Sequence, residues 1–510
     1  MPPTIRKAII NPPFAANWVN RHFTVQQDCK RYYSIKRPQP QSVSLIIEDM
    51  KACAIAMQSI FADAVAQGQR LRCIGGGWSL SDAAVTDGWL LDTLALNLVW
   101  TMQQNQVDIK YKHINDFGRL WFSQCGVTVQ KLNDLMETHG WSMTTSGASN
   151  GQTIAGAVST GTHGSAYQFG AMTEFVVGIH IVVDPNRVVY LERDSYPVVS
   201  QAFATELGAE LVRDDELFNA ALVSFGSFGM IAGLMLEAEP LYMFETSRVR
   251  IKQALLRNAM DTLKLDNLGL LPAGKTPWHF EVTFNPHDSL GDGYVRTLYK
   301  MDFVNHPKPV SPPGKLQSGE GLLGIIGTLG NVLSANKVAA ALNLLMQGNL
   351  QLINAVKGTS GEIFSSTFLE GKAMSMELGI DMKDSSKVLD IMLNLHPEVD
   401  VYLGVISYRW VKQSTAMLGF TKFSITATIE FNAAPNNRTL NFYNRLWNEL
   451  EVQNIPYTLH WGQMNNFTPQ RIKKMYGTAV DKWMACRNKL MTPAGKAVFT
   501  SKFLQSTGLG

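Results

Sequence analysis

Three consecutive glycines at 75–77 follow a short β-like run, Leu71–Ile74, and precede Trp78 and Ser79. Glycine tolerates positive φ and has no Cβ, so a ligand can approach such a turn closely. The successive backbone N–H groups, with the hydroxyls of Ser79 and Ser81 beside them, can converge on phosphate oxygens. The turn has neither the Gly-Lys-Ser/Thr of a Walker loop nor the spacing of a Rossmann fingerprint. By itself it is equally compatible with a glycine-rich connection that binds nothing.

A second small-residue segment runs from Ser146 to Ser165 and reads SGASNGQTIAGAVSTGTHGS. This composition packs poorly as a core element, but it suits a backbone that wraps a large, flat ligand and offers N–H and hydroxyl donors. A merely flexible loop is disfavoured because Ile154, Ala157 and Val158 have the spacing of one helical face. The segment therefore indicates a binding site.

Four segments, in order, resemble those of the aldonolactone and alditol oxidases, which are PCMH-type FAD flavoproteins of the vanillyl-alcohol-oxidase superfamily. Residues 151–165 resemble the second flavin-binding segment, and the glycine turn is similar to the pyrophosphate loop G-x-G-H-S. Residues 214–240 resemble the segment that approaches the adenosine end of FAD. A terminal block resembles the H-W-G-K block of the D-arabinono-1,4-lactone oxidase type, and it comprises Leu459, His460, Trp461, Gly462, Gln463, Tyr476, Trp483, Arg487, Pro493 and Gly495.

The resemblance implies an FAD cofactor and a set of residues that contact it. His163 is expected to contact the flavin or to have a structural role. The implied cofactor contacts are Gly75, Gly76, Gly77, Trp78, Ser79, Ser81, Gly147, Ala148, Ser149, Gln152, Thr153, Gly156, Ser159, Gly161, His163, Gly229 and Ile231.

The resemblance fails at the residue that many relatives use to attach the flavin. They link the 8α-methyl carbon to the histidine of G-x-G-H-S, where this chain has Trp78, and an indole is not such a nucleophile. No cysteine lies within Gly147–Ser165, where some relatives make a second attachment. We therefore predict non-covalent FAD, with Trp78 covering the dimethylbenzene edge of the flavin; the alternative for Trp78 is a plain core aromatic.

The oxidases also place an acid and an arginine on one face of a strand, as E-x-R. The best match is Val405–Trp410, where strand alternation puts Ser407 and Arg409 on the same side, so serine replaces the acid. Arg409 is expected to stabilise negative charge on the reduced flavin or on a substrate alkoxide; the alternative is a surface salt bridge. Gln463 replaces the lysine of H-W-G-K, which removes a cation from the expected flavin N1 side.

Oxidation of an alcohol needs a base for the hydroxyl proton while hydride leaves carbon. The candidates are His460, Glu430 and Glu281. Histidine has the ordinary pKa nearest to neutrality, although His460 can equally be a structural histidine. The catalytic set predicted here comprises Arg409, His460, Gln463, Ser407 and Glu430.

The elements that position these residues alternate helix and strand in the first half of the chain. Apolar spacing predicts a helix over 46–67, and strands are expected at 71–74 and 107–111. The resemblance implies an α+β fold with an FAD domain at 1–240, a substrate domain with a large antiparallel sheet at 241–455, and a segment at 456–510 that returns to the FAD domain. The apolar stretch within 311–357 is expected to be a buried helix, or else a surface that meets a lipid, a lipophilic substrate or another subunit.

Composition excludes several classes of function. Lys and Arg number 45 against 42 Asp and Glu, without a dense basic cluster, so nucleic-acid binding is not expected. No apolar run is long enough to cross a membrane, and the first residues make a poor signal peptide. The five cysteines are scattered, without metal-ligand spacing, as in a reducing compartment, so we expect a cytoplasmic protein without a metal site.

Three functions remain open. The first is oxidation of a sugar alcohol, aldonolactone or related alcohol by hydride transfer to FAD, with oxygen or another acceptor taking the electrons. The second is oxidation of a lipophilic alcohol, as in the cholesterol oxidases of this architecture. The third is a flavin-binding protein without turnover, since three residues of the family pattern are absent.

Overall fold

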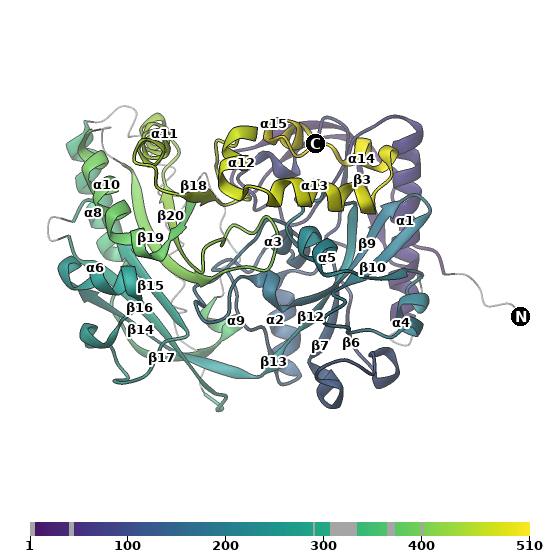
Figure 1. Ribbon diagram of the computed structural model, residues 1–510, viewed down its shortest axis with the longest axis horizontal. Coiled ribbons are helices and arrows are strands. Elements are labelled where there is room, and N and C mark those ends of the chain that lie inside the picture. The colour runs from purple at the N-terminus through teal and green to yellow at the C-terminus, as the bar shows by residue number, and fades with distance from the viewer. Residues whose placement is uncertain (1–5, 40–44, 289–290, 307–333, 365–372, 399–401) are drawn as a thin grey trace, which may run out of the picture.

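A computed structural model describes residues 6–39, 45–288, 291–306, 334–364, 373–398 and 402–510. Figure 1 shows a large sheet and its helices on the left and the elements of the first half of the chain on the right. The C-terminal helices lie across the top of that first half. The fold is therefore the predicted α+β type.

The first sheet carries the glycine turn. Helix α1 (Ile46–Ala66) connects β3 to β4, and β3 and β4 both pair in parallel with β5. The face of α1 that bears Met50, Met57 and Phe61 is buried, as its spacing predicts. Strand β4 ends at Ile74, so the glycines begin at the carboxyl edge of the sheet. The strands are β1 (Ile9–Ile10), β2 (Phe14–Val19), β3 (Gln26–Lys36), β4 (Leu71–Ile74) and β5 (Trp89–Asp92).

A second sheet has the strand order β11-β10-β9-β12-β7-β6. Its strands are β6 (Val99–Thr101), β7 (Leu120–Gln124), β9 (Val176–Asp184), β10 (Arg187–Glu192), β11 (Glu210–Arg213) and β12 (Met230–Glu237), with the short pair β8 (Trp141–Ser142) and β13 (Glu239–Pro240) beside it. The helices are α2 (Val129–Thr138), α3 (Ile154–Ser159), α4 (Gln201–Glu206) and α5 (Asp215–Leu222). Residues 107–111, predicted as a strand, form only an isolated bridge at Val107 and turns, so that prediction is wrong.

The large antiparallel sheet is confirmed. Within the described residues it has eight strands in the order β17-β14-β16-β15-β19-β20-β18-β21. They are β14 (Tyr242–Ile251), β15 (His279–Phe284), β16 (Gly293–Asp302), β17 (Ile353–Thr359), β18 (Met374–Asp381), β19 (Gly404–Lys412), β20 (Ile425–Ala433) and β21 (Tyr457–Leu459). Strand β21 lies within the predicted returning segment, so the chain leaves this sheet only after Leu459.

The two faces of this sheet differ because side chains alternate along each strand. On β19, Tyr408 and Trp410 are fully buried against helices: Trp410 Nε1 donates to the carbonyl oxygen of Met260, and the Tyr408 hydroxyl to that of Ser385. The helices of this part are α6 (Gln253–Thr262), α8 (Ala335–Asn349), α9 (Ser360–Ile363), α10 (Ser385–Glu398) and α11 (Asn437–Val452). The opposite face, with Ser407 and Arg409, is left for the cavity described below.

The C-terminal helices hold the first half of the chain. Trp483 Nε1 donates to the carbonyl oxygen of Val223 at 3.3 Å, and Arg487 Nε to that of Ser227 at 3.0 Å. The helices are α12 (Pro469–Tyr476), α13 (Ala479–Leu490), α14 (Pro493–Phe499) and α15 (Lys502–Thr507), drawn in yellow in Figure 1. The chain thus returns to its first half, as the terminal block implies.

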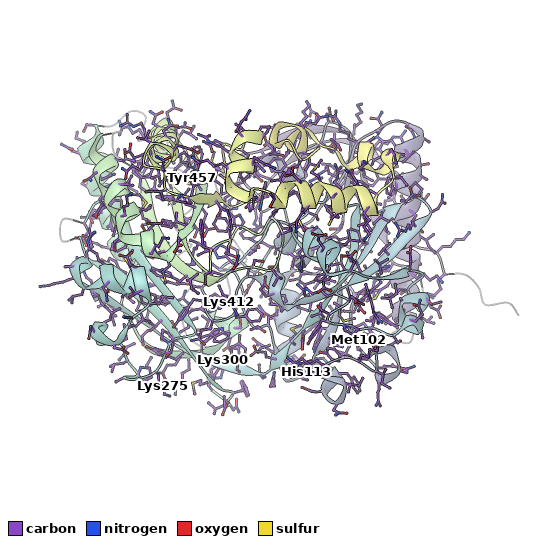
Figure 2. The ribbon with its side chains drawn as sticks, in the orientation of Figure 1. Met102, His113, Lys275, Lys300, Lys412 and Tyr457 are labelled. Atoms are coloured by element: carbon purple, nitrogen blue, oxygen red, sulfur yellow. The ribbon has the colours of Figure 1, made fainter. Side chains whose placement is uncertain are left out.

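One lysine fixes the junction between the two halves. Lys300, labelled in Figure 2, pairs with Glu239 and lies 4.1 Å from the ring centre of Tyr242 and 4.8 Å from that of Trp278. The Tyr242 hydroxyl donates to the carbonyl oxygen of Met143.

The apolar stretch predicted within 311–357 can be compared only in part, because residues 307–333 lie outside the described residues. Within α8, Val338 and Leu342 are buried and Leu344 is exposed.

Candidate active site

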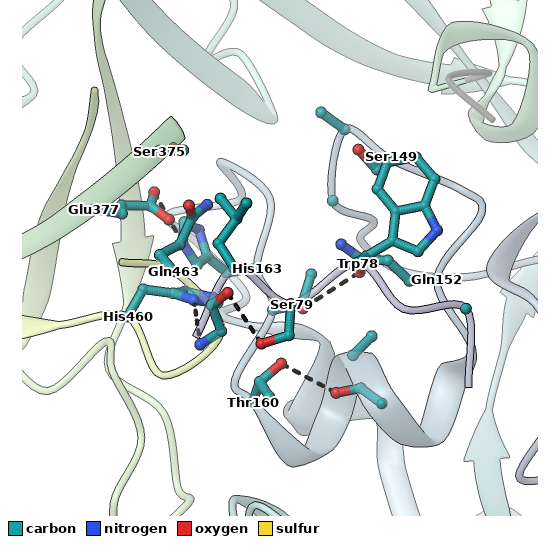
Figure 3. Close-up of a pocket in the computed structure, with 18 of the residues that line it drawn as sticks. Trp78, Ser79, Ser149, Gln152, Thr160, His163, Ser375, Glu377, His460 and Gln463 are labelled. Atoms are coloured by element: carbon teal, nitrogen blue, oxygen red, sulfur yellow. Dashed lines mark hydrogen bonds and ion pairs between the residues drawn. The ribbon is translucent and has the colours of Figure 1, made fainter. Parts of the chain in front are cut away.

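One elongated cavity lies between the small-residue loops of the first half and the polar face of the large sheet. Figure 3 shows Trp78, Ser149 and Gln152 on one side, and Glu377, His460 and Gln463 on the other. All five predicted catalytic residues line it, and so do fifteen of the seventeen implied cofactor contacts. The chain therefore brings its predicted site residues together from both halves and from the terminal block.

The loop side of the cavity fits a dinucleotide cofactor. Among the described residues, no hydrogen-bond acceptor faces the backbone N–H groups of Gly76, Gly77 or Trp78. Thr153 caps α3 by accepting from the N–H of Gly156, and both residues line the same cavity. The N–H groups of the glycine turn also line the cavity, so they can donate to the phosphate oxygens of a bound cofactor.

The far end of the cavity is lined by Gly226, Gly229 and Ile231. Gly229 has φ +117°, and a Cβ there would lie 2.2 Å from the carbonyl oxygen of Val182, so only glycine fits. Arg72 lines the same end and donates to the carbonyl oxygens of Ala83, Phe225 and Gly226. Burial lowers the pKa of Arg72 to about 10, and no carboxylate among the described residues pairs with it. Sequence reasoning missed this buried cation at the cavity.

Two implied cofactor contacts lie outside the cavity. The Ser81 hydroxyl donates to the carbonyl oxygen of Trp461 at 2.6 Å and caps the short helical turn that follows. Gly161, with φ +76°, forms the turn after α3, and a Cβ there would meet Val223 and Phe420. Both residues hold the loops in place and do not line the cavity; their contact with FAD stays a prediction.

Trp78 lies along the cavity wall between two glycines. A Cβ on Gly151 would meet its ring at 2.5 Å, and one on Gly76 at 2.9 Å, so the indole occupies space that only glycines leave open. The ring also stands edge-on to His22, and its Nε1 has no acceptor among the described residues. Trp78 is therefore a packed aromatic that also faces the cavity. Its contact with the dimethylbenzene edge of the flavin stays a prediction.

The sheet side of the cavity carries an ordered array of charge. Register places Arg409 directly opposite Glu281, and Ser407 directly opposite Glu430. Ser407 and Arg409 thus share a face, as predicted. Arg409 Nη1 lies 2.7 Å from Glu430 Oε2, and its Nε lies 3.7 Å from Glu281 Oε1. The acid missing from E-x-R is thus present across the strands, and Arg409 is 18% exposed inside the cavity, not on the surface.

These contacts set the protonation states. Although burial opposes it, the charges of Glu430, Glu281 and Glu377 raise the pKa of Arg409. Burial likewise works against ionisation of Glu281, but Arg296 and Arg409 lower the pKa of that carboxyl to about 2. Glu281 is therefore a poor proton acceptor near neutral pH.

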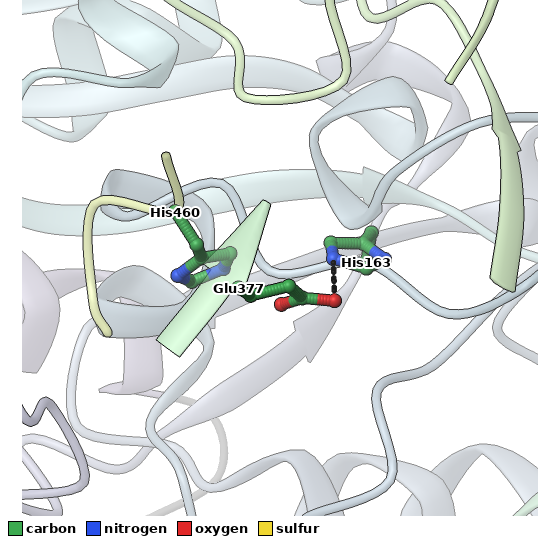
Figure 4. A group of neighbouring side chains, drawn as sticks. All are labelled: His163, Glu377 and His460. Carbon is green, nitrogen blue, oxygen red and sulfur yellow. Dashed lines mark ion pairs between the residues drawn. The ribbon is translucent and has the colours of Figure 1, made fainter. Parts of the chain in front are cut away.

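A second charged group joins the sheet to the flavin loops. Figure 4 shows Glu377 of β18 between the rings of His163 and His460. His163 Nε2 lies 3.2 Å from Glu377 Oε1, and its Nδ1 donates to the carbonyl oxygen of Gly164 at 2.9 Å. Burial works against protonation, but Glu377 and the Gly164 carbonyl raise the pKa of His163. These contacts favour the protonated form of His163.

His460 has the opposite state. Its Nδ1 accepts from the N–H of Gly462 at 3.0 Å, which leaves the proton on Nε2. Burial lowers the pKa of His460 to about 4, with the charge of His163 adding to the effect and that of Glu377 opposing it. In the neutral ring, Nε2 carries the proton and the lone pair of Nδ1 already accepts from Gly462. His460 therefore has no free nitrogen to take a substrate proton, so it is a donor and not the base. The same orientation makes His163, Glu377 and His460 a poor metal site, although their ligand atoms lie within 4.8 Å of one another.

Glu430 is the remaining predicted base. Its Oε2 pairs with Arg409, while its Oε1 has only long contacts, 3.5 Å to Ser375 Oγ and 3.4 Å to Gln463 Nε2. Gln463 Oε1 has no donor among the described residues and is buried at the cavity. Glu430 Oε1 is thus the carboxylate oxygen best able to accept a new hydrogen bond from a substrate hydroxyl.

Sequence reasoning missed three further charged residues on this face, namely Glu377, Arg248 and Arg296. A signal was present in β18, where apolar Met376, Leu378 and Ile380 alternate with polar positions. Because side chains alternate along a strand, Glu377 lies on the face of the large sheet that the helices do not cover.

The fold and the cavity indicate a protein that binds FAD. Residues 54–190 match the family described as FAD binding domain.

The sequence relatives are aldonolactone oxidases. The chain is 26% identical over 225 residues to D-arabinono-1,4-lactone oxidase of Kluyveromyces lactis. This alignment covers 44% of this chain and 36% of that protein. The match to the Saccharomyces cerevisiae protein of the same name is 26% identical and covers 49% of this chain and 40% of that protein. L-gulonolactone oxidase 3 of Arabidopsis thaliana is 25% identical over 426 residues, 76% of this chain and 69% of that protein. The chain thus matches well under half the length of the yeast relatives.

Solved structures share the fold. A solvent-stable cholesterol oxidase superposes with TM-score 0.67 at 13% identity over 98% of both chains. Cholesterol oxidase of Brevibacterium sterolicum superposes with TM-score 0.65 at 12% identity over 97% of both chains. At this identity the likeness concerns the architecture alone.

Proposed function

We propose that the protein is an FAD-dependent oxidase that removes hydride from the CH–OH group of a sugar-derived alcohol or lactone. Bound FAD would supply the hydride acceptor. The observation that carries the proposal is the polar face of the large sheet, which turns three carboxylates and three arginines toward the small-residue flavin loops. The names of the sequence relatives support the substrate class.

The same face argues against a lipophilic alcohol. An apolar ring system placed over Arg409, Glu281 and Glu430 would strip water from these charges and return no hydrogen bond. A polyhydroxylated substrate offers a hydroxyl to each of them. The cholesterol oxidases share only the architecture with this chain, so their likeness does not favour a sterol.

In this proposal each polar residue at the cavity has a separate role in the reaction. Glu430 Oε1 accepts the proton of the reacting hydroxyl, and Arg409 stabilises the negative charge that develops there. Nε2–H of His460 donates to a ligand oxygen, and Gln463 Oε1 accepts from a ligand donor. The polar sheet and the loops enclose the reacting carbon, so bulk water is kept away.

The proposed electron acceptor is dioxygen, which would leave as hydrogen peroxide after taking two electrons and two protons. The relatives are named oxidases, which supports this acceptor.

We also propose that the protein works in the cytoplasm. All five cysteines are free thiols, which supports a reducing compartment, and subcellular fractionation would test the placement. Within the described residues, no helix has both the length and the apolar character that a membrane crossing needs.

Anaerobic mixing with sugar-derived alcohols tests the function. At least one alditol, aldonolactone or related polyol should bleach the flavin absorbance, and admission of oxygen should restore it with one peroxide per flavin. Sterols, terpenoids and long-chain alcohols should leave the spectrum unchanged. Bleaching by a sterol alone would favour the lipophilic alternative, and a flavin that no alcohol reduces would favour a binding protein without turnover.

We propose in addition that FAD is held without a covalent bond, because Trp78 stands where relatives carry the linking histidine. Cys73 also lines the cavity, but burial raises the pKa of its thiol to about 12, so it is not a nucleophile near neutral pH. Acid precipitation of the yellow protein should release all of its FAD into the supernatant, and the intact mass should equal that of the bare chain. Flavin retained in the pellet would contradict this.

A further inference from the structure

A pair of arginines stands on the polar face at the end remote from His460. Arg248 on β14 lies directly opposite Arg296 on β16, and both line the cavity. Arg248 is only 4% exposed, and Arg296 is 12% exposed in its side chain. Two buried guanidinium groups in adjacent register repel each other, so their position calls for a negative charge between or above them.

Little negative charge lies close to this pair among the described residues. Glu430 pairs with Arg409 and Glu377 lies beside His163, so Glu281 is the carboxylate that remains for the two arginines. Glu281 Oε2 lies 3.6 Å from Arg296 Nη1, while its Oε1 accepts from Ser165. Two arginines therefore share one carboxylate, which also lies 3.7 Å from Arg409.

The hydrogen bonds of the pair are also incomplete. Within the described part of the chain, Arg248 donates only to the carbonyl oxygen of Gln351, at 3.1 Å. Arg296 Nε has a long contact of 3.4 Å to Thr246 Oγ1, and its buried Nη2 has no acceptor. A guanidinium pair with free donors matches the geometry of a carboxylate, which accepts two parallel N–H bonds.

The spacing between strands sets the length of a ligand that could extend from the arginine pair to Arg409. Strand β15 alone separates β16 from β19, and neighbouring strands lie about 4.8 Å apart, so the backbone at Arg296 is about 10 Å from that at Arg409. A chain of five or six carbons held at the arginine pair can therefore bring a CH–OH group to Arg409, whose Nη1 lies 2.7 Å from Glu430 Oε2.

We propose that the substrate is a polyhydroxy acid of the aldonate class, whose carboxylate binds Arg248 and Arg296 while a remote hydroxyl reacts. This inference rests on the proposed function, and it narrows the substrate from neutral polyols and lactones to their open-chain acids. A carboxylate is planar and offers two oxygens, which matches the planar guanidinium groups of this pair better than a tetrahedral phosphate does.

The test is a set of matched ligands titrated into the FAD-loaded protein without oxygen. D-gluconate and D-sorbitol have the same six-carbon chain and differ in one end group, while sorbitol 6-phosphate carries a dianion. Dissociation constants come from flavin absorbance, whether a ligand perturbs or reduces the cofactor. D-gluconate should bind at least tenfold more tightly than D-sorbitol, and added NaCl should weaken only the anions. Equal binding of the two, binding of neither, or tightest binding of the phosphate overturns the proposal.

Variants identify the subsite. Arg248→Gln and Arg296→Gln should each raise the dissociation constant of D-gluconate tenfold or more and leave that of D-sorbitol within twofold. Arg296→Lys keeps the charge and should recover part of the affinity. Arg250→Gln is the matched control, because Arg250 lies two residues along β14 and pairs with Asp288 and Asp292 outside the cavity. Loss of D-gluconate affinity in the Arg250 variant alone would contradict the assignment.

Two failures remain distinguishable. If D-gluconate binds through the arginine pair but no alcohol ever reduces the flavin, the proposed function fails and the anion subsite stands. If D-sorbitol bleaches the flavin and D-gluconate binds no more tightly, the oxidase stands and the aldonate inference fails.

Discussion

Glu430→Gln is expected to lower kcat by about 100- to 10,000-fold, the usual loss when a general base is removed. The amide keeps the size of the side chain and can still contact Arg409, Ser375 and Gln463, but it cannot take the hydroxyl proton. Flavin content and the dissociation constant of the substrate should change little. Anaerobic single-turnover reduction of the flavin measures the chemical step directly.

The matched control is Glu245→Gln on strand β14 of the same sheet. Glu245 pairs with Lys357 at 3.7 Å, is a quarter exposed and does not line the cavity, so kcat should stay within twofold. A Glu430→Gln enzyme that reduces its flavin within threefold of the native rate would remove Glu430 from the role of base.

Arg409→Gln is expected to lower the free energy of unfolding by about 3–5 kcal/mol, the usual cost of removing one partner from a buried charge pair. Arg409 faces Glu430, Glu281 and Glu377 together, so its loss leaves Glu430 without its paired cation and removes one of the cations beside the other two carboxylates. Urea midpoints and Tm of the FAD-loaded protein measure the change. Arg257→Gln is the control, because Arg257 pairs with exposed Asp390 and should contribute less than about 1 kcal/mol.

The same variant should shift the acid stability of the protein. The pKa values of Glu281 and Glu377 lie near 2 in the fold, against an ordinary value of 4.5. Depressed carboxyl pKa values stabilise the fold above the unfolded value, and this contribution is lost as pH falls from about 4.5 toward 2. Without Arg409 both pKa values rise, so the acid transition should begin at a higher pH. A transition at unchanged pH, together with an unchanged urea midpoint, would show that the charge array contributes nothing to stability.

Local sequence was sufficient for the parts of the site that are built within one segment. The glycine turn follows β4, and Thr153 and Asp214 cap α3 and α5 at the positions their residue types favour. Strand alternation placed Ser407 and Arg409 on one face. These features depend on neighbours a few residues away, so the order of residues determines them.

The charge array is different because its members are neighbours only through strand pairing. The missing acid of E-x-R is supplied by Glu430, which lies opposite Ser407 on the next strand, and Glu377 reaches the site one strand further on. Register between distant strands depends on the packing of the whole sheet, which no local pattern specifies.

Protonation and orientation were also decided by tertiary contacts. His460 was a reasonable base from its residue type, but the N–H of Gly462 and burial make it a neutral donor. Ser81 turned from the cavity to the carbonyl oxygen of Trp461, far along the chain. Contiguous segments were enough to predict the cofactor class and the flavin loops. Which carboxylate is open to a ligand, how His163 and His460 differ, and where two arginines share one carboxylate follow only from the folded sheet, because burial and pairing across strands set those properties.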